Sequence, residues 1–268
     1  MWYRRAAAAL AIVAAIAGCG GLETTAVSYD RLMYGNLTTF TVTGVNLDKG
    51  VSLITSACPT PQQLTGGTAT QQTFTCTVTS TGSVTISVIG GNVVLHKAEA
   101  NVPVPQVTIK TSMGDLLLEL DPVKAPITSL NFMRYVNNSY YNNLIFHRVI
   151  ANFVIQGGGY DANMVGPNTL APIKLESGNG LTNLRGTLAM ARLGTPDSAT
   201  SQFYVNVVDN PSLDKSDTNG DGYAVFGKVI SGMDTVDAIA AVPTATTASG
   251  VADVPVTPVV MTSVTQTQ

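Results

Sequence analysis

One segment in the second half of the chain, residues 146–159 with the sequence FHRVIANFVIQGGG, constrains the fold more than any other. Arg148 and Gln156 lie eight residues apart in an otherwise apolar run. If the segment is extended, alternate side chains share a face, so these two polar side chains share one. Phe153 lies at odd spacing from both and joins that face only through a bend, which Asn152 is placed to supply. The three glycines that close the segment predict the end of the strand, where backbone turns or approaches its surroundings closely.

Three further blocks follow in order: residues 179–192 (NGLTNLRGTLAMAR), 201–207 (SQFYVNV) and 223–229 (YAVFGKV). Together with the first segment they closely resemble the cyclophilins, the peptidyl-prolyl cis/trans isomerases, in the family's order and with family-like gaps. The resemblance covers residues 105–268 and implies an eight-stranded antiparallel closed barrel capped by two helices. Side chains fill a barrel of this size, so we expect the active site on its outer face.

The resemblance also implies roles for single residues. Arg148, Phe153 and Gln156 match the catalytic positions. The residues that match substrate-binding positions are Val154, Ala191, Arg192, Gln202, Tyr204, Leu213 and Tyr223. We expect Arg148 to donate to the proline nitrogen, which regains a lone pair as the amide twists, while an apolar slot holds the proline ring. Proline-containing polypeptides are the expected partners, and no cofactor or metal is expected, because rotation about an X–Pro bond needs neither.

Two other chemistries can be considered. A serine-hydrolase site would have to pair Ser201 with His147, but no motif places an acid beside them, so we expect neither to be catalytic. The loop 217–221 (DTNGD) resembles the start of a calcium loop. Lys228 stands where an EF-hand needs a glutamate, so a full EF-hand is excluded and only a weakly held ion stays open.

The start of the chain predicts export and lipidation. A basic n-region precedes an apolar stretch over 6–17, which is too short to span a bilayer as a mature helix. It ends in IAGC, which resembles the bacterial lipobox. We therefore expect a signal peptide over 1–18, lipidation of Cys19 and a tether over 19–25. An ordinary secretory signal with an incidental cysteine is the alternative. Gly20, rather than aspartate, follows the cysteine, which implies a periplasmic protein anchored by lipid to the outer membrane.

Composition agrees with export. Charged residues make up 12% of the chain, the formal net charge is −3, and no basic patch points to nucleic acid. With Cys19 set aside, Cys58 and Cys76 remain and predict a disulfide in an oxidising compartment. Two free buried thiols are the alternative.

Residues 26–101 predict a small immunoglobulin-like β-sandwich, because Thr and Val alternate in short runs separated by glycines. A Gly-Gly-Asn turn predicts a hairpin between 83–89 and 93–99. No catalytic constellation stands out in this domain, so we expect a spacer, with partner binding as the alternative. Two prolines in 102–106 predict an extended linker before the isomerase domain, 107–268.

The isomerase domain has its own local signals. A hairpin is predicted between 107–111 and 116–120, a helix opening at Pro126, a second helix over 233–241 and a closing strand over 259–264. The apolar stripe expected on the first helix consists of Ile127, Leu130, Phe132, Met133 and Val136.

Two functions from different classes fit these features. The first is an active, membrane-anchored prolyl isomerase that assists the folding of exported proteins. The second is a non-catalytic module on the same scaffold, which binds proline-containing peptides or acts as a chaperone. The intact set of Arg148, Phe153 and Gln156 favours the first.

Overall fold

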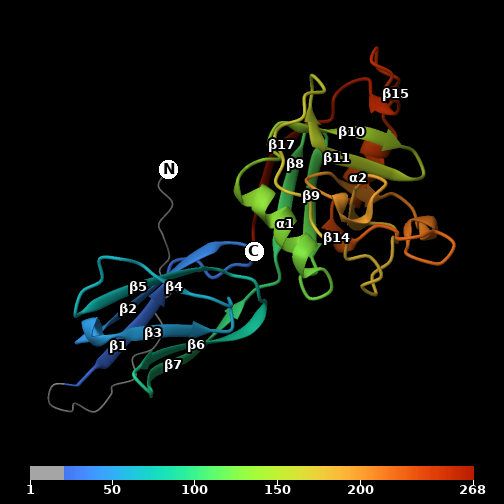
Figure 1. The fold of residues 1–268 in the computed structure, drawn as a ribbon. Helices are drawn as coiled ribbons and strands as arrows, with labels where there is room; N and C mark the ends of the chain where they lie inside the picture. Colours follow the sequence, from blue (N-terminus) through green and yellow to red (C-terminus); the bar gives the residue numbers. More distant parts are fainter. Residues whose placement is uncertain (1–20) are drawn as a thin grey trace. The chain divides into compact units, whose positions relative to one another are not determined.

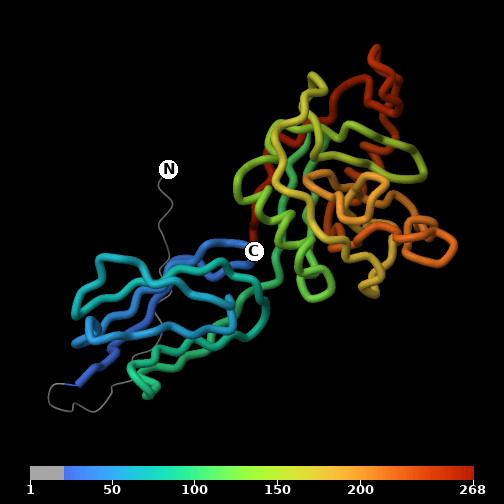
Figure 2. Tube along the Cα trace, in the orientation of Figure 1, coloured from blue at the N-terminus to red at the C-terminus, as the bar shows by residue number. Residues whose placement is uncertain are grey.

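The computed structural model describes residues 21–268, which form two compact units divided between Pro103 and Val104 (Figures 1 and 2). This division lies within the predicted linker, 102–106. No helix among the described residues is long and apolar enough to cross a membrane. The predicted signal peptide and the lipidation site, Cys19, lie outside the described residues.

The first unit consists of two antiparallel sheets with strand orders β1-β2-β5-β4 and β3-β6-β7. Alternate side chains of the longer strands are buried, which is the pattern of sheets with one covered face. The predicted glycine-turn hairpin is confirmed, because β6 and β7 pair along their length. The strands are β1 (Glu23–Tyr29), β2 (Leu37–Val45), β3 (Val51–Thr55), β4 (Gln62–Gln63), β5 (Gln71–Thr77), β6 (Gly82–Gly90) and β7 (Val93–Val102).

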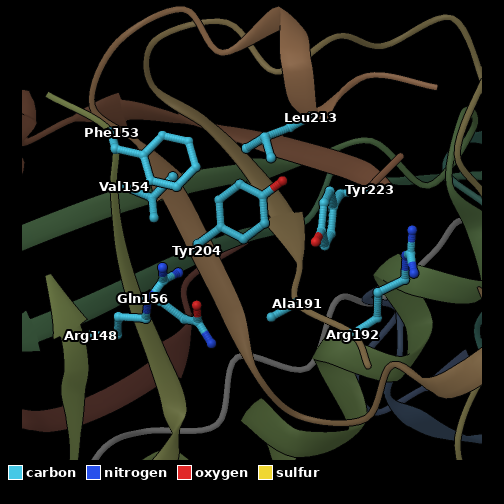
Figure 3. Close-up of a pocket in the computed structure, with 9 residues that line it drawn as sticks. All are labelled: Arg148, Phe153, Val154, Gln156, Ala191, Arg192, Tyr204, Leu213 and Tyr223. Carbon is cyan, nitrogen blue, oxygen red and sulfur yellow. The ribbon is translucent and has the colours of Figure 1, made fainter. Parts of the chain in front are cut away.

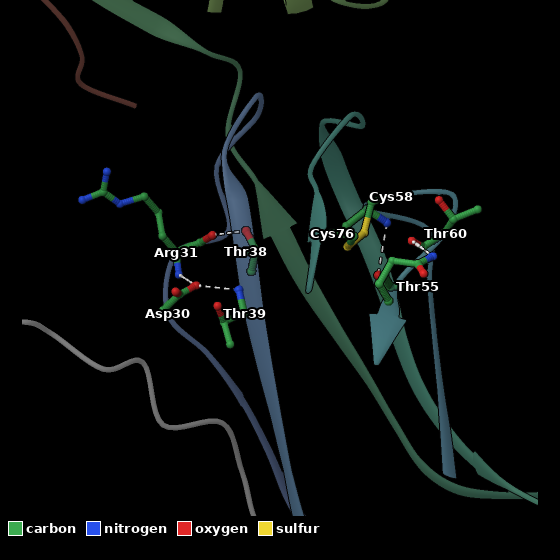
Figure 4. The surroundings of a disulfide bond; sticks show 10 residues. Asp30, Arg31, Thr38, Thr39, Thr55, Cys58, Thr60 and Cys76 are labelled. Atoms are coloured by element: carbon green, nitrogen blue, oxygen red, sulfur yellow. Dashed lines mark hydrogen bonds between the residues drawn. A yellow bond between two sulfur atoms is a disulfide. The ribbon is translucent and has the colours of Figure 1, made fainter. Parts of the chain in front are cut away.

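A disulfide between Cys58 and Cys76 joins these two sheets (Figure 4). Cys58 follows β3 in one sheet and Cys76 lies in β5 of the other, with the two Cα atoms 6.2 Å apart. Both cysteines are buried. The bond therefore fixes the packing of one sheet on the other through the core of the unit.

Replacing both cysteines with alanine should destabilise the first unit alone. Closing a loop of 18 residues restricts the unfolded chain and contributes about 3 kcal/mol to stability. Urea unfolding monitored through amide NMR signals reports separately on residues 23–102 and on residues 106–266. We expect a loss of this size in the first set and no change in the second. An equal loss in both sets would contradict the assignment of the disulfide to one independent unit.

The second unit is built on an eight-stranded sheet, ordered β10-β11-β13-β12-β14-β9-β8-β17 within residues 104–268. A bridge between Ile145 and Val260 links its two edge strands and nearly closes the barrel. The predicted hairpin of β8 and β9 and the closing strand β17 are confirmed. The strands of this sheet are β8 (Gln106–Thr111), β9 (Gly114–Leu120), β10 (Leu144–Ile150), β11 (Val154–Asp161), β12 (Thr187–Met190), β13 (Phe203–Asn206), β14 (Val225–Ser231) and β17 (Met261–Gln266).

The barrel interior is filled with aromatic rings. Phe132 lies within 5.2–5.3 Å, between ring centroids, of Tyr141, Phe203 and Phe226. All four side chains are fully buried. This packing leaves no room for a ligand inside, as expected for eight strands, so a binding site has to lie on the outer surface.

Both predicted helices are present, α1 (Pro126–Asn137) and α2 (Met233–Ala240), as Figure 1 shows. Pro126 occupies the first turn of α1, where its missing N–H costs nothing. In α2, Val236 and Ile239 are fully buried as expected.

The apolar stripe predicted for α1 is wrong at Ile127, whose side chain is 42% exposed, while Thr128 and Ser129 are buried in its place. A carboxylate from a distant loop caps this first turn. Glu176 accepts hydrogen bonds from the backbone N–H of Ile127 and of Thr128, at 3.0 and 2.8 Å. It also accepts one from the Thr128 hydroxyl, which satisfies this buried polar side chain.

The segment 146–159 is a hairpin rather than one extended strand, and the bend that the sequence predicted at Asn152 is its turn. The turn between β10 and β11 falls at Asn152, which adopts a left-handed φ of 57°. Arg148 and Gln156 are therefore direct cross-strand partners. The two side chains share a face, as the spacing predicted. They do so because they pair across the hairpin and not because they alternate along one strand.

The three glycines also do not end the strand, because β11 continues to Asp161. Gly158 has a φ of 81°, and a Cβ there would lie 2.8 Å from the Tyr141 ring and 2.9 Å from the Ser201 carbonyl oxygen. The close approach expected of these glycines is thus present, but it bends β11 over the barrel core.

Gly158→Ala should lower the stability of the second unit by about 2 kcal/mol or more, because it adds backbone strain to a steric clash. Gly194→Ala is the matched control, since a Cβ at Gly194 meets no atom within 4 Å. Urea denaturation of both variants checks the expectation. Equal stability of the two variants would contradict the close packing at Gly158.

Candidate functional site

A pocket of about 310 Å³ lies against the sheet of the second unit (Figure 3). It collects nine of the ten residues that the sequence predicted as catalytic or substrate-binding; Gln202 is the one that does not line it. The lining residues are Arg148, Phe153, Val154, Gln156, Ala191, Arg192, Tyr204, Leu213 and Tyr223.

The apolar part of the pocket has a rigid floor. Val154, Tyr204 and Val225 are each at most 4% exposed and pack together. Phe153 and Tyr223 are partly buried against this cluster and form its rim. The Tyr204 and Tyr223 rings meet edge to face with centroids 5.8 Å apart. Such an apolar slot is suited to a small saturated ring such as that of proline.

The hydroxyl group of Tyr204 is anchored below this floor. It donates to Asn183 Oδ1 at 2.8 Å, and the Asn183 amide nitrogen donates to Asp214 Oδ1 at 2.7 Å. Burial raises the pKa of Tyr204 above its ordinary value, so the hydroxyl remains a neutral donor. Leu213, beside Asp214 in the chain, lies on the pocket rim. The floor and this side of the rim are thus connected.

The same network reaches the opposite side of the rim. The Asn206 amide donates to Asn183 Oδ1, and the Asn210 amide donates to Asn206 Oδ1 at 2.8 Å and to the Phe153 carbonyl at 3.0 Å. Asn183, 1% exposed, is a supporting residue that sequence reasoning missed. Its position in the 179–192 block, which resembles the cyclophilins, could have pointed to a role near the site. Only the structure shows that it accepts the hydrogen bond from Tyr204.

The polar end of the pocket carries Arg148 and Gln156, which lie side by side in Figure 3. Gln156 Nε2 donates to Gln202 Oε1 at 2.9 Å. A Cβ on Gly159 would lie 2.7 Å from the amide carbon of Gln202, so this glycine leaves the space that Gln202 occupies. Gln202 therefore contacts the pocket-lining Gln156 and is not itself among the lining residues.

Arg192 braces the other end of the pocket. Its guanidinium carbon lies 4.8 Å from the centroid of the Tyr223 ring, a cation–π geometry. Its Nε donates to the Gly222 carbonyl at 2.9 Å and its Nη1 to the Leu193 carbonyl at 2.9 Å. These contacts hold the Tyr223 ring at the rim.

His147 and Ser201 lie beneath the pocket and are not arranged as a hydrolase pair. The Ser201 hydroxyl is 1% exposed, donates to the Gly158 carbonyl at 2.8 Å and accepts from Tyr140. His147 is 4% exposed and packs edge to face on Tyr160. Burial lowers the pKa of His147 to about 4, against the opposing effect of a hydrogen bond with Gln202. A neutral, buried imidazole has a structural role here.

The 217–221 loop folds on itself. The Asn219 amide donates to the carbonyl groups of Pro211 and Asp214, at 3.0 and 3.2 Å. Within residues 21–268, no three His, Cys, Asp or Glu side chains come together to hold a metal ion.

Comparison with known proteins extends this picture. Residues 106–266 match the family described as Cyclophilin type peptidyl-prolyl cis-trans isomerase/CLD. The chain belongs to this family. A peptidyl-prolyl cis-trans isomerase from Acinetobacter baylyi is 57% identical over 159 residues, which cover 59% of this chain and 82% of the relative. The Escherichia coli isomerase B is 51% identical over 162 residues, 59% of this chain and 98% of the relative.

A solved structure supports the same cyclophilin assignment at the level of fold. The cyclophilin type isomerase of Cryptosporidium parvum, crystallised in the presence of the dipeptide Ala-Pro, aligns with a TM-score of 0.50 at 26% identity. The alignment covers 61% of this chain and 99% of that one. The match accounts for the cyclophilin unit and leaves the disulfide-linked sheets of residues 21–103 outside it.

The stability of the cyclophilin unit should fall as pH drops through the range set by His147. An unfolded imidazole titrates near pH 6.5 and the folded one near 4, so unfolding takes up a proton between these values. The stability that comes from keeping His147 neutral in the folded state is fully present above about pH 6.5. It is lost toward pH 4, and the total loss is about 3 kcal/mol. The His147→Gln variant should lack this loss of stability. Urea denaturation of both proteins at a series of pH values measures it. Parallel wild-type and variant curves would rule the effect out.

Proposed function

We propose that this chain catalyses cis/trans isomerisation of X–Pro bonds, with Arg148 stabilising the twisted amide while the apolar slot holds the proline ring. The observation that supports this most directly is the pocket itself. It brings the guanidinium of Arg148 to the edge of a slot floored by buried side chains, Val154 and Tyr204. Proline-containing polypeptides are the substrates this geometry fits.

The size of the barrier shows what the pocket must supply. Rotation about the peptide bond costs about 18–20 kcal/mol. A turnover of about 10³ s⁻¹ requires the barrier to fall by roughly 6–7 kcal/mol. Only contacts that are stronger in the twisted amide than in either planar state contribute to this.

Arg148 provides a contact of that kind. When the amide twists, resonance is lost, the proline nitrogen becomes pyramidal and its lone pair becomes an acceptor. A guanidinium at the slot edge can donate to this nitrogen, and its fork of N–H groups can also reach a substrate carbonyl oxygen. Gln156, fixed by its hydrogen bond to Gln202, is placed to bind substrate backbone or to orient the arginine.

The apolar slot holds the proline ring in place while the amide rotates. Phe153, Leu213 and Tyr223 surround the ring site on a floor that the Asn183 network prevents from shifting. A proline ring held there stays still while the residue before it rotates, so binding energy is directed to the twist. The backbone at Ala191 and Arg192, next to the slot, is placed to pair with the substrate chain.

The substrates are exported proteins in this proposal. Its support is the sequence of the first nineteen residues, which matches a lipoprotein signal ending at Cys19, and the Cys58–Cys76 disulfide, which suits an oxidising compartment. Lipidation at Cys19 would anchor the chain to the outer membrane facing the periplasm. Residues 26–101 would then serve as the spacer between membrane and enzyme.

Isomerase activity is tested by exchange NMR on a short Xaa-Pro peptide, with protein beginning at Gly20. We expect strong acceleration by the wild type, a loss of about 100-fold or more in kcat/KM for Arg148→Ala, and a smaller loss for Arg148→Lys, which keeps the charge without the fork. Arg134→Ala, which removes an exposed guanidinium from α1, is the matched control and should match the wild type.

A lack of catalysis would instead favour the second function, a non-catalytic module that binds proline-containing peptides. If folded wild-type protein binds the peptide but does not accelerate exchange, the pocket belongs to a tethering or chaperone module on a cyclophilin fold. Equal activity of Arg148→Ala and wild type would place the chemistry elsewhere.

A further inference from the structure

The guanidinium of Arg148 has a charged neighbour outside the pocket. Arg148 Nε lies 3.7 Å from Oδ2 of Asp253. This distance is that of an ion pair and is longer than a hydrogen bond. Both side chains are about 40% exposed, at 42% and 40%. A pair this accessible adds little to the stability of the fold, so we expect its effect on the active site instead.

The backbone at Asp253 is fixed against the strand that carries the arginine. The Asp253 carbonyl accepts a hydrogen bond from the Val149 N–H at 2.8 Å, one residue from Arg148. Asp253 has a left-handed φ of 62°, a conformation that few side chains other than those of Asn and Asp tolerate. It precedes β16 (Val254–Pro255), which pairs with β15 (Thr244–Ala245) in the connection between α2 and β17.

Arg148 is thereby contacted from two sides. Its cross-strand partner Gln156 lies on the pocket side, and Asp253 approaches Nε. A carboxylate at Nε leaves the terminal Nη groups, two of the guanidinium's three nitrogens, free for a substrate. An arginine side chain loses rotamer entropy when it is fixed, so an arginine that is already oriented binds the twisted amide at a lower entropic cost.

We propose that Asp253 is a positioning residue for the isomerase reaction: its carboxylate orients the Arg148 guanidinium so that the Nη groups face the slot. This role rests on the proposed function of Arg148. The α2–β17 connection is thus part of the active site, although Asp253 does not line the pocket. Because the pair is exposed, its effect depends on ionic strength.

The test measures kcat and KM by exchange NMR for three variants beside the wild type. Asp253→Asn removes the charge and tolerates the left-handed backbone. Asp253→Gly removes the whole side chain and keeps that φ. Asp217→Asn, which removes the same charge from the exposed 217–221 loop, is the control. Each is measured at low salt and at 1 M NaCl, where the screening length is about 3 Å.

At low salt we expect kcat to fall about two- to fivefold in Asp253→Asn, at least as far in Asp253→Gly, with KM little changed. At high salt the wild-type kcat should approach that of Asp253→Asn, while Asp217→Asn follows the wild type throughout. Wild-type kcat in both Asp253 variants, or an equal loss in Asp217→Asn, would overturn the proposal.

A second readout separates this proposal from the function on which it rests. The Nε–Hε resonance of Arg148, assigned by its absence in Arg148→Lys, should move in Asp253→Asn and stay in place in Asp217→Asn. If the wild type proves inactive while this resonance moves, the contact exists and the proposed reaction is what failed. An unmoved resonance in Asp253→Asn rejects the contact itself.

Discussion

The pairing of β10 with β11 is the interaction on which the site depends. A tight turn at Asn152 returns the chain on itself, and the resulting register sets Arg148 directly opposite Gln156. A shift of one residue would send the two polar side chains to opposite faces of the sheet. The turn also delivers Phe153 to the rim, since this residue lies just before β11 begins. One hairpin thus supplies Arg148, Gln156 and Phe153 to the pocket.

The filled barrel makes an external pocket possible. Rings such as Phe132 and Phe203 occupy the interior, so the strands cannot move inward when a ligand presses on their outer face. Buried side-chain amides then fix the pocket residues and the segments that connect the strands. Asn183 holds the Tyr204 hydroxyl and Asn210 holds the Phe153 carbonyl, and Asn206 links the two. Each of these groups is satisfied by its neighbours, which is the condition under which a buried polar network gives rigidity.

Much of this architecture was predictable from the sequence, because its signals are local or belong to contiguous motifs. The hairpin of β8 and β9 and the start of α1 at Pro126 follow from such patterns, and the set of pocket residues follows from the resemblance to the cyclophilins. The failures come from contacts between distant segments. On α1, Thr128 is buried with its hydroxyl bonded to Glu176 from a distant loop, while Ile127 is exposed. In the 146–159 segment, β11 runs past the glycines expected to end it and pairs with both β10 and β13. Periodicity in one segment carries no information about either contact.

The two halves of the pocket differ in how firmly they are held, and this difference bears on mechanism. The floor of the slot is buried and its polar groups are hydrogen-bonded, so the slot keeps its shape when a substrate binds. The guanidinium of Arg148 is 42% exposed and is held by an ion pair that solvent and salt can weaken. In the proposed mechanism the amide rotates while the proline ring stays fixed, so a firmly held slot and a less firmly held guanidinium suit the two parts of the substrate. The proposed role of Asp253 would then make the orientation of the guanidinium, rather than the slot, the part of the site that salt or substitution can adjust.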